Sequence, residues 1–348
     1  MKLLILTQKI DKQDLVLGFF HGWVLELSKK FEKVSVICLE KGAYDLPGNV
    51  QVFSLGKESG RSKVKYVKNF FNLILGLNKE YDSVFVHMNQ EYILLGGFFW
   101  RIMRKKVYFW RNHPKGSLLT NIAVLLSNKV FCTSKASFTA KFKKTSLMPV
   151  GVDTSIFNTE SRIKNYELCK GKILFLGRIA PIKNEKVFIE ALNILNKKSI
   201  SFEASVYGDP LPKDQEYYEW LKEKVKDLNL ENKMTFYKGV PNNQTPEVYG
   251  DHDICVNLTP TGSFDKTIIE AAMCGAIPIM ANKSLEGEID DKLILDELSP
   301  ENLAERIEFW LKTKESKKAE VSKRIRNYVL ENHSLDALMK KLCIEIKK

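Results

Sequence analysis

Residues 172–196 read KILFLGRIAPIKNEKVFIEALNILN, and this stretch decides the fold. A β-type apolar run at 172–177 is followed by a short loop with a proline and then by apolar residues at helical spacing over 185–196. Another β-type run lies at 201–207. A strand, a helix and a strand at this spacing predict a parallel sheet with crossover helices.

The same alternation runs through both halves of the chain. In the N-terminal half, strands are predicted at 3–6, 34–39, 83–87, 106–110 and 129–133, and helices at 20–31, 63–78, 92–103 and 118–126. In the C-terminal half, further strands are predicted at 234–237, 254–258 and 277–280, with helices at 215–228, 267–274 and 335–346. The pattern predicts an α/β protein of two tandem Rossmann-like, doubly wound domains that face a central cleft, where the carboxyl ends of the strands hold ligands.

Domain boundaries follow from breaks in this pattern. The residues at 149–153 and the polar segment at 158–170 interrupt it. We therefore expect an N-terminal domain at 1–160, a C-terminal domain at 161–325, and a C-terminal helix at 326–348 that packs back toward the N-terminal domain.

Composition excludes several classes of protein. Of the 348 residues, 44% are apolar and 28% are charged, which is too apolar for a disordered chain. No apolar stretch approaches the ~20 residues that cross a bilayer, and the opening MKLLILT lacks a signal-peptide cleavage site. The six cysteines form no Cys-x-x-Cys pair and indicate reduced core thiols. We expect a globular protein in the cytoplasm.

The net charge of +12 is concentrated in the first half of the chain. Residues 1–150 contain 24 Lys and Arg against 10 Asp and Glu, whereas residues 151–348 contain 30 against 32. A basic surface attracts anionic lipid headgroups or nucleic acid, although any single basic run can be a solvated helix face. Because no nucleic-acid-binding module is recognisable, we expect no nucleic-acid partner. We expect peripheral contact with the inner face of a membrane instead.

The first cluster of residues that could bind a ligand lies in the loop after the strand predicted at 172–177. Gly177 and Arg178 end the strand, and Lys183 follows five residues after the arginine, just before the helix. A guanidinium can chelate two phosphate oxygens and an ammonium adds a point charge, and both lie at a helix N-terminus. The loop predicts a diphosphate site, for which a merely solvated basic loop is the alternative.

The second cluster is TPTGSFDKTIIEAAMCGAIP at 259–278. The loop at 262–267 leads into a helix whose first-turn amides and Thr hydroxyl suit phosphate oxygens. Glu270 lies one turn inside that helix among apolar neighbours, where a carboxylate is costly unless it accepts hydrogen bonds. The two hydroxyl groups of a ribose would donate them.

These two clusters, in this order, resemble the C-terminal domain of GT-B glycosyltransferases, specifically the retaining enzymes of glycosyltransferase family 4, or glycosyl transferases group 1. The family has Gly-Arg with a Lys five residues on, then a loop and a helix ending in Glu-Ala-Met-Ala-x-Gly-x-Pro, where this chain reads EAAMCGAIP from Glu270. Further similarities are PVGVD at 149–153, YGD at 207–209 and FYKGV at 236–240. The resemblance is close over 145–280 and looser over the N-terminal half.

The resemblance implies roles for individual residues. Arg178 and Lys183 match the pair that neutralises the donor diphosphate, and Glu270 matches the residue that holds the nucleotide ribose. His113 matches the histidine that contacts the transferred sugar, with a polar loop histidine as the alternative. The implied catalytic residues are His113, Arg178, Lys183 and Glu270. The implied nucleotide-sugar contacts are Gly18, Gly177, Arg178, Lys183, Gly239, Val240, Asp265, Lys266, Thr267 and Glu270.

One position departs from the family pattern. The family usually has a second Glu eight positions before the one matched by Glu270, and Gly262 stands there. Asp265 is then expected to reach the donor sugar in its place. His87 and Asn89, after the strand at 83–87, are candidate acceptor contacts, for which polarity at a structural turn is the alternative.

The sequence predicts no metal and no cofactor besides the nucleotide-sugar co-substrate. Asp251-His252-Asp253 is similar to the Asp-x-Asp metal motif of the other large glycosyltransferase fold, but it precedes a core strand and is typical of a turn. No Walker loop, nucleophile elbow or dinucleotide-binding motif is present.

The resemblance implies a retaining, hexosyltransferase-type glycosyltransferase whose N-terminal domain binds a glycan or lipid-linked acceptor and whose C-terminal domain binds the nucleotide-sugar. The basic N-terminal half suits a lipid-linked or anionic acceptor and points to cell-envelope polysaccharide biosynthesis. The alternative, suggested by Gly262, is a catalytically inactive sugar-nucleotide-binding or scaffolding protein of the same fold.

Overall fold

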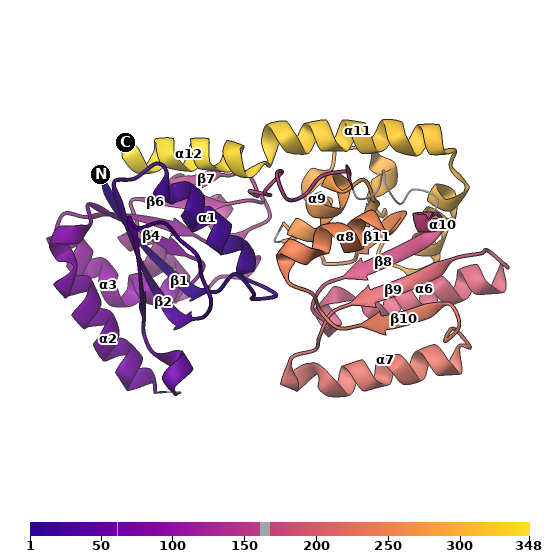
Figure 1. The fold of residues 1–348 in the computed structure, drawn as a ribbon, viewed down its shortest axis with the longest axis horizontal. Helices are drawn as coiled ribbons and strands as arrows, with labels where there is room; N and C mark the ends of the chain where they lie inside the picture. Colours follow the sequence, from indigo (N-terminus) through magenta and orange to yellow (C-terminus); the bar gives the residue numbers. More distant parts are fainter. Residues whose placement is uncertain (61, 161–167, 263) are drawn as a thin grey trace. The chain divides into compact units, whose positions relative to one another are not determined.

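The computed structural model describes residues 1–60, 62–160, 168–262 and 264–348. The chain divides into two compact units. The N-terminal unit comprises Met1–Gly151 and Leu335–Lys348, and the C-terminal unit comprises Val152–Ser334. Figure 1 labels the helices and strands of both units.

The N-terminal unit contains a seven-stranded sheet in the order β3-β2-β1-β4-β5-β6-β7, with every strand pair parallel. Its strands are β1 Lys2–Ile10, β2 Lys33–Lys41, β3 Val50–Ser54, β4 Ser83–His87, β5 Lys106–Trp110, β6 Lys129–Cys132 and β7 Thr145–Leu147. Its helices are α1 Gly18–Ser28, α2 Lys63–Gly76, α3 Gln90–Ile102, α4 Leu118–Leu126 and α12 Leu335–Lys347. The sequence did not predict the edge strands β3 and β7, because their mostly half-buried or exposed residues give no clear apolar run.

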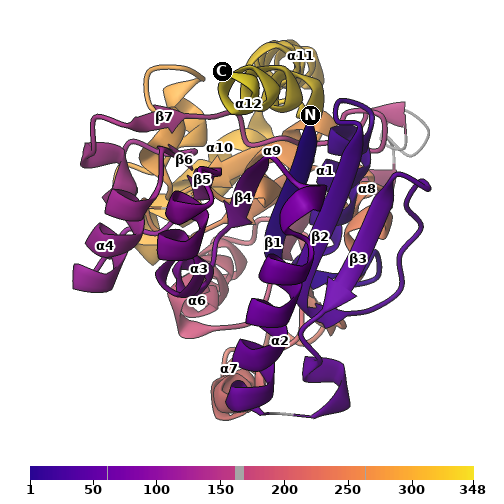
Figure 2. The ribbon, with the colours of Figure 1, turned by 90° about the vertical axis from the view of Figure 1, so that its left-hand side faces the viewer.

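Helices cover both faces of this sheet (Figure 2). Successive side chains of β1 therefore enter two different cores, one on each face of the sheet. Leu3 and Ile5 pack in one core with α1 and α12. Leu4 and Leu6 pack in the other core with α2, α3 and α4. Burial on both faces explains why the central strands read as continuous apolar runs in the sequence.

The boundary between the units lies at Gly151 and Val152 rather than at 160 and 161. The Gly151 carbonyl accepts a hydrogen bond from Trp23 Nε1 at 3.3 Å, which keeps it in the N-terminal unit. Val152 forms a parallel bridge with Ser334, where the chain leaves the C-terminal unit. The helix that packs in the N-terminal core therefore begins at Leu335, not at 326. Most of the predicted linker at 158–170 lies outside the described residues.

The C-terminal unit contains a five-stranded parallel sheet in the order β10-β9-β8-β11-β12. Its strands are β8 Lys172–Leu176, β9 Glu203–Tyr207, β10 Met234–Tyr237, β11 Ile254–Asn257 and β12 Ile277–Met280. Its helices are α6 Glu185–Lys197, α7 Gln215–Asp227, α8 Thr245–Gly250, α9 Lys266–Met273, α10 Pro300–Lys312 and α11 Glu315–Asn332. The sequence did not predict the short helix α8.

Two general features complete the fold. All six cysteines are buried thiols, as the sequence predicted. Within the described parts of the chain, no helix combines the length and the apolar character that a membrane span requires.

Candidate functional site

The C-terminal sheet changes its winding direction between β8 and β11. The chain runs outward from β8 to β9 and β10 on one side, and β11 and β12 lie on the other side. The loops after β8 and β11 therefore leave the carboxyl edge of the sheet as neighbours. Ligands of doubly wound sheets bind at this switch point. Both sequence clusters lie in these two loops.

Glycines fix the start of the loop after β8. A Cβ atom added to Gly208 would lie 1.8 Å from the carbonyl oxygen of Gly177, so only glycine fits at position 208. The Gly177 N–H donates to the carbonyl of Tyr207 at 3.0 Å, which ties this loop to the end of β9. Arg178 follows with an exposed side chain, and no hydrogen bond or ion pair engages that side chain within the described residues.

Lys183 joins the two clusters. It ends a 3-10 turn, Pro181–Lys183, and the next residue, Asn184, adopts a left-handed conformation with φ 62° before α6 begins. The Lys183 ammonium donates to Thr259 Oγ1 at 3.0 Å and to Asp265 Oδ2 at 2.5 Å. The structure thus connects the predicted phosphate loop to the loop that leads into α9.

Asp265 caps the N-terminus of α9. Its Oδ1 accepts hydrogen bonds from the Thr267 N–H at 3.3 Å and the Thr267 hydroxyl at 3.1 Å, and its Oδ2 accepts one from Thr259 Oγ1 at 2.9 Å. Burial acts to raise the pKa of Asp265, but the charge and hydrogen bond of Lys183 outweigh it and hold that pKa below its usual range. Asp265 is therefore an anion placed against Lys183. Its predicted contact with the donor sugar stays a prediction.

Glu270 is buried, and its carboxylate has two protein donors. Its Oε1 accepts from Asn242 Nδ2 at 3.2 Å and its Oε2 from the Tyr249 hydroxyl at 3.1 Å. Burial raises its pKa, and the charge of Lys266 opposes that rise. Burial lowers the pKa of the half-buried Lys266, which Glu270 opposes in turn. Sequence reasoning missed Asn242 and Tyr249, and ribose binding by Glu270 stays a prediction.

The loop after β10 carries Gly239 and Val240. The Gly239 N–H donates to Asp209 Oδ2 at 3.1 Å, and the rings of Tyr207 and Tyr237 stack with centroids 4.5 Å apart. These contacts join the loops after β9 and β10. The same loop continues to Asn242 and so reaches Glu270.

Glu185 is a buried carboxyl group that sequence reasoning also missed. It is the first residue of α6, and its Oε1 accepts from the Ala180 N–H at 3.0 Å, inside the loop that carries Arg178 and Lys183. The Tyr217 hydroxyl donates to its Oε2 at 3.2 Å. Burial raises the pKa of Glu185 to about 7. The only sequence signal was an acidic residue in the first turn of a helix, which is common.

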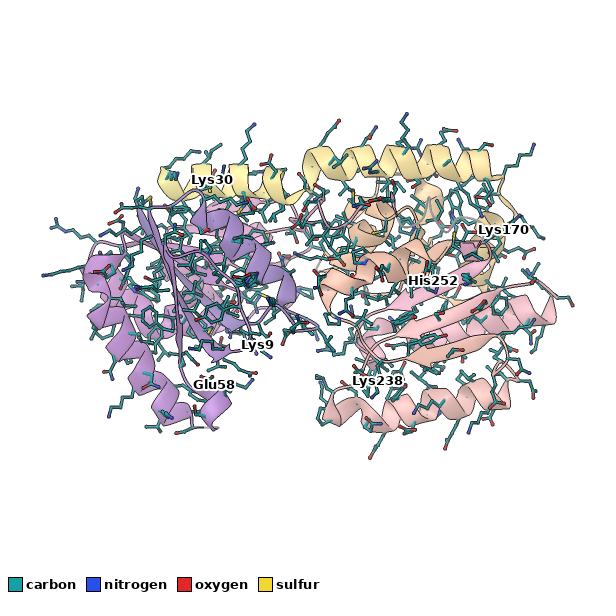
Figure 3. All side chains as sticks on the ribbon, viewed as in Figure 1. Lys9, Lys30, Glu58, Lys170, Lys238 and His252 are labelled. Atoms are coloured by element: carbon teal, nitrogen blue, oxygen red, sulfur yellow. The ribbon has the colours of Figure 1, made fainter. Side chains whose placement is uncertain are left out.

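In the N-terminal unit, the winding changes between β1 and β4. Lys9, near the end of β1 (Figure 3), forms ion pairs with Asp14 at 2.9 Å and Glu40 at 3.1 Å. Burial acts to lower the pKa of Lys9, but the hydrogen bonds to these two carboxylates outweigh it and raise that pKa. The pairs hold the segment that leads to Gly18, the first residue of α1.

The other N-terminal candidates lie in loops or at strand ends on the carboxyl side of the same sheet. His87, the last residue of β4, is buried and stacks on Phe20, with ring centroids 4.0 Å apart. Asn89 is half-buried at the N-cap of α3. His113 is exposed after β5, and its Nδ1 lies 3.0 Å from the Lys115 backbone nitrogen and 2.8 Å from the Lys115 carbonyl oxygen. Their contacts with substrates stay predictions.

The Asp251-His252-Asp253 stretch has structural contacts. His252, labelled in Figure 3, is buried, and its Nδ1 lies 2.6 Å from the Val248 carbonyl oxygen. Asp253 Oδ2 accepts from the buried Lys318 ammonium at 2.7 Å. Across the described residues, no group of three or more His, Cys, Asp or Glu side chains is placed to hold a metal ion.

Two doubly wound, parallel α/β units in one chain are typical of the GT-B class of fold. The Anabaena protein HepE, solved in complex with UDP and glucose, superposes with a TM-score of 0.80 at 17% sequence identity, and the match covers 100% of both chains. The predicted fold class is confirmed.

Residues 158–328 match the family described as Glycosyl transferases group 1, so this part of the chain belongs to that family. The mannosylfructose-phosphate synthase of Agrobacterium fabrum is 28% identical over 144 residues, which is 39% of this chain and 32% of that protein. The D-inositol 3-phosphate glycosyltransferase of Paenarthrobacter aurescens is 26% identical over 181 residues, 49% of this chain and 43% of that protein. The matches thus span less than half the length of these relatives. The resemblance predicted from the sequence is confirmed.

Proposed function

We propose that the protein is a glycosyltransferase that moves a sugar from a nucleotide-diphosphate sugar to a hydroxyl group of a glycan or lipid-linked acceptor, with retention of configuration. The observation that carries this proposal is the joining of the loops after β8 and β11 through Lys183, Thr259 and Asp265. The family match over 158–328 and the UDP and glucose bound by HepE support the choice of donor.

In the proposed transfer, the bond between the anomeric carbon and the phosphate oxygen breaks. The acceptor oxygen bonds to the same face of that carbon, and its proton passes to the leaving phosphate. Arg178, Lys183 and the first amides of α9 stabilise the negative charge that develops on the diphosphate. In this proposal Glu270 holds the ribose, and His113 contacts the transferred sugar.

Because Lys183 forms an ion pair with Asp265, Lys183 and Arg178 have different roles in this proposal. An ammonium has three donors, and two of those of Lys183 are engaged by Thr259 and Asp265. One remains for a phosphate oxygen, but the charge of Lys183 is already balanced. Arg178 therefore supplies the uncompensated positive charge of the loop.

The remaining parts of the proposal concern the acceptor and the setting. The acceptor binds the basic N-terminal unit. The glycosylated product of the transfer is an intermediate of cell-envelope polysaccharide biosynthesis. The protein works in the cytoplasm at the inner face of a membrane, and donor binding requires no metal. The 24 basic against 10 acidic residues at 1–150 support an anionic or membrane-bound acceptor.

The test is a turnover assay with UDP-, GDP-, ADP- and CMP-sugars in the presence of EDTA, with and without lipid-linked and glycan acceptors. We expect the enzyme to release the nucleotide from only one of these donors, and one class of acceptor to accelerate that release. NMR of the product should show that the transferred sugar keeps the anomeric configuration it had in the donor. Arg178→Ala should abolish release, whereas Lys186→Ala, on the exposed side of α6, should not. Release that is equal in the wild type and Arg178→Ala would refute the assigned site.

A second candidate is a sugar-nucleotide-binding protein without transferase activity. Two observations favour it: Gly262 stands where the family usually has Glu, and Asp265 places a negative charge beside Lys183. Saturable nucleotide-sugar binding without turnover under any acceptor condition would select this candidate.

A further inference from the structure

Helix α4 of the N-terminal unit is apolar on its outer side as well as on its core side. Its sequence, LLTNIAVLL, contains no charged residue. Thr120, Ala123 and Val124 face the core, whereas Leu118 is 73% exposed and Leu125 is 68% exposed. A helix that is apolar all round is normally buried, so the outer side of α4 indicates a contact surface.

Helix α3 extends this surface. The Thr120 hydroxyl donates to Gln90 Oε1 at 2.8 Å near the start of both helices. Near their ends, a Cβ atom on Gly97 would lie 3.0 Å from Leu126 Cβ, so the two helices run side by side in the same direction (Figure 2). On α3, Phe98 is 63% exposed and Ile102 is 64% exposed. We define the α3–α4 surface as Phe98, Ile102, Leu118, Leu119, Ile122 and Leu125.

A cationic cavity adjoins the α3–α4 surface. It has a volume of about 390 Å³, and its lining includes Leu125 of that surface together with Arg101, Arg104, Lys105, Lys106 and Lys144. Lys105 and Lys144 donate to backbone carbonyls, which fixes them in the wall. Arg101 and Arg104 are exposed, and within the described residues neither has an ion pair.

Glu91, in the first turn of α3, is the last acidic residue before a long basic stretch of the sequence. From residue 92 to residue 152 there are 11 Lys and Arg and no Asp or Glu. The cations therefore meet no carboxylate from this whole segment. Burial, together with the charge of Arg101, lowers the pKa of Lys144, as expected where cations gather.

We propose that the α3–α4 surface docks on an anionic lipid bilayer. The six apolar side chains enter the boundary between headgroups and acyl chains, and Arg101 and Arg104 bind headgroup phosphates at the cavity. This gives the membrane contact of the proposed function a defined surface. It does not involve the donor site in the C-terminal unit, so either proposal can fail without the other.

A second copy of the chain fits this surface less well than a bilayer. In a symmetric dimer the same patch lies on both sides of the interface, so Arg101 and Arg104 of both copies would be gathered in one interface. Residues 92–152 contribute no carboxylate that would separate them. Anionic headgroups supply the missing charge, whereas a second copy adds more cations.

The first test is flotation of the full chain with vesicles of phosphatidylcholine alone and of equal parts phosphatidylcholine and phosphatidylglycerol. We expect binding to the anionic vesicles only, weakened by added salt. Arg101→Gln with Arg104→Gln should lower the vesicle affinity about 10- to 30-fold. Ile122→Ser with Leu125→Ser should lower it about tenfold or more.

Matched controls lie on α12 of the same unit. Lys340→Gln with Lys341→Gln removes the same charge from exposed positions, and Ile344→Ser removes an exposed apolar side chain. Both controls should keep wild-type affinity for the anionic vesicles. Thermal unfolding and nucleotide binding of every variant show whether the chain is still folded.

The second test places a probe in the surface itself. Because all six native cysteines are buried, Ile122→Cys introduces a selectively reactive thiol for an environment-sensitive fluorophore. We expect a blue shift of its emission on anionic vesicles and no shift for the same probe at Ile344→Cys. The proposal is overturned if the wild type does not float with anionic vesicles, or if the surface variants bind as well as the controls. It is equally overturned if the surface variants change a dimer into a monomer while their binding to anionic vesicles stays that of the wild type.

Discussion

Arg178 and Lys183 have different surroundings, although the sequence assigns both to one phosphate site. Arg178 is exposed and has no ion pair or hydrogen bond within the described residues, whereas Lys183 compensates the carboxylate of Asp265. Removing each cation should therefore have a different consequence.

We predict that Arg178→Ala lowers affinity for a nucleoside diphosphate about 10- to 100-fold and leaves the free energy of unfolding unchanged. Lys183→Ala should lower affinity and also destabilise the fold by about 1–3 kcal/mol, because it leaves Asp265 without its cation. Calorimetric titration and urea unfolding measure the two effects. A loss of stability in Arg178→Ala equal to that in Lys183→Ala would contradict this distinction.

Asp265→Asn tests whether Asp265 opposes anion binding at Lys183. Asn is as good an N-cap as Asp, so α9 keeps its cap while the negative charge is lost. We predict that affinity for the nucleoside diphosphate rises about 3- to 10-fold. Asp291→Asn, near α10, is the matched control and should change nothing. An unchanged or lower affinity in Asp265→Asn would show that Asp265 does not compete with the diphosphate.

The sequence identified candidate site residues but not the residues that hydrogen-bond to them. Arg178, Lys183 and Glu270 stand in recognisable local motifs. The donors to Glu270 come from Asn242 and Tyr249, on a different loop and helix. No local pattern links them, because only the packing of α8 and the loop after β10 against α9 brings them to the carboxylate.

At the scale of elements, the start of α6 predicts a dependence of stability on pH. Burial raises the pKa of Glu185 from 4.5 to about 7 in the folded chain. In this interval Glu185 therefore binds more protons in the folded state than in the unfolded state. Its contribution to stability is fully present below pH 4.5 and is lost as pH rises toward 7. The contribution lost is about 3 kcal/mol.

Glu185→Gln should remove this contribution to the pH dependence. We predict that urea unfolding of the variant changes less between pH 4.5 and 7 than that of the wild type. Glu190→Gln, on the same helix but half-buried beside Lys224, should keep the wild-type profile. Identical profiles for Glu185→Gln and the wild type would contradict the raised pKa.

The elements that the sequence predicted with their exact bounds include three strands that are buried along most of their length, β4, β5 and β12. The strands at 83–87, 106–110, 234–237 and 277–280 and the helix at 118–126 have the predicted bounds. The edge strands β3 and β7 are only partly buried, so they carry weak apolar patterns. Helix α8 is too short, at six residues, to show a helical period.

At the scale of the whole molecule, the chain crosses between its units twice, after Gly151 and after Ser334. The sequence could predict that the last helix packs near the N-terminal domain, but not where it begins. The break at 334 and 335 depends on which core receives the side chains. Leu338 is fully buried in the core that contains Trp23 of α1.

We predict that Leu338→Ala destabilises the N-terminal unit by about 2–5 kcal/mol and leaves the C-terminal unit unchanged. Differential scanning calorimetry should show one transition moved to lower temperature and one transition kept. Added nucleotide should still stabilise the kept transition. Ile344→Ala, at an exposed position of α12, is the control and should move neither. A shift of both transitions together would contradict the division into two units.

Titration calorimetry of the full chain with UDP, GDP, ADP and CMP in EDTA measures nucleotide affinity at the proposed donor site directly. We predict saturable binding of one base class, with affinity lowered at least about tenfold in Arg178→Ala and in Glu270→Gln. The exposed-site variant Lys186→Ala should bind as the wild type does. Binding of none of the nucleotides, or equal affinity in all four proteins, would contradict the assignment of Arg178 and Glu270 to a nucleotide-diphosphate site.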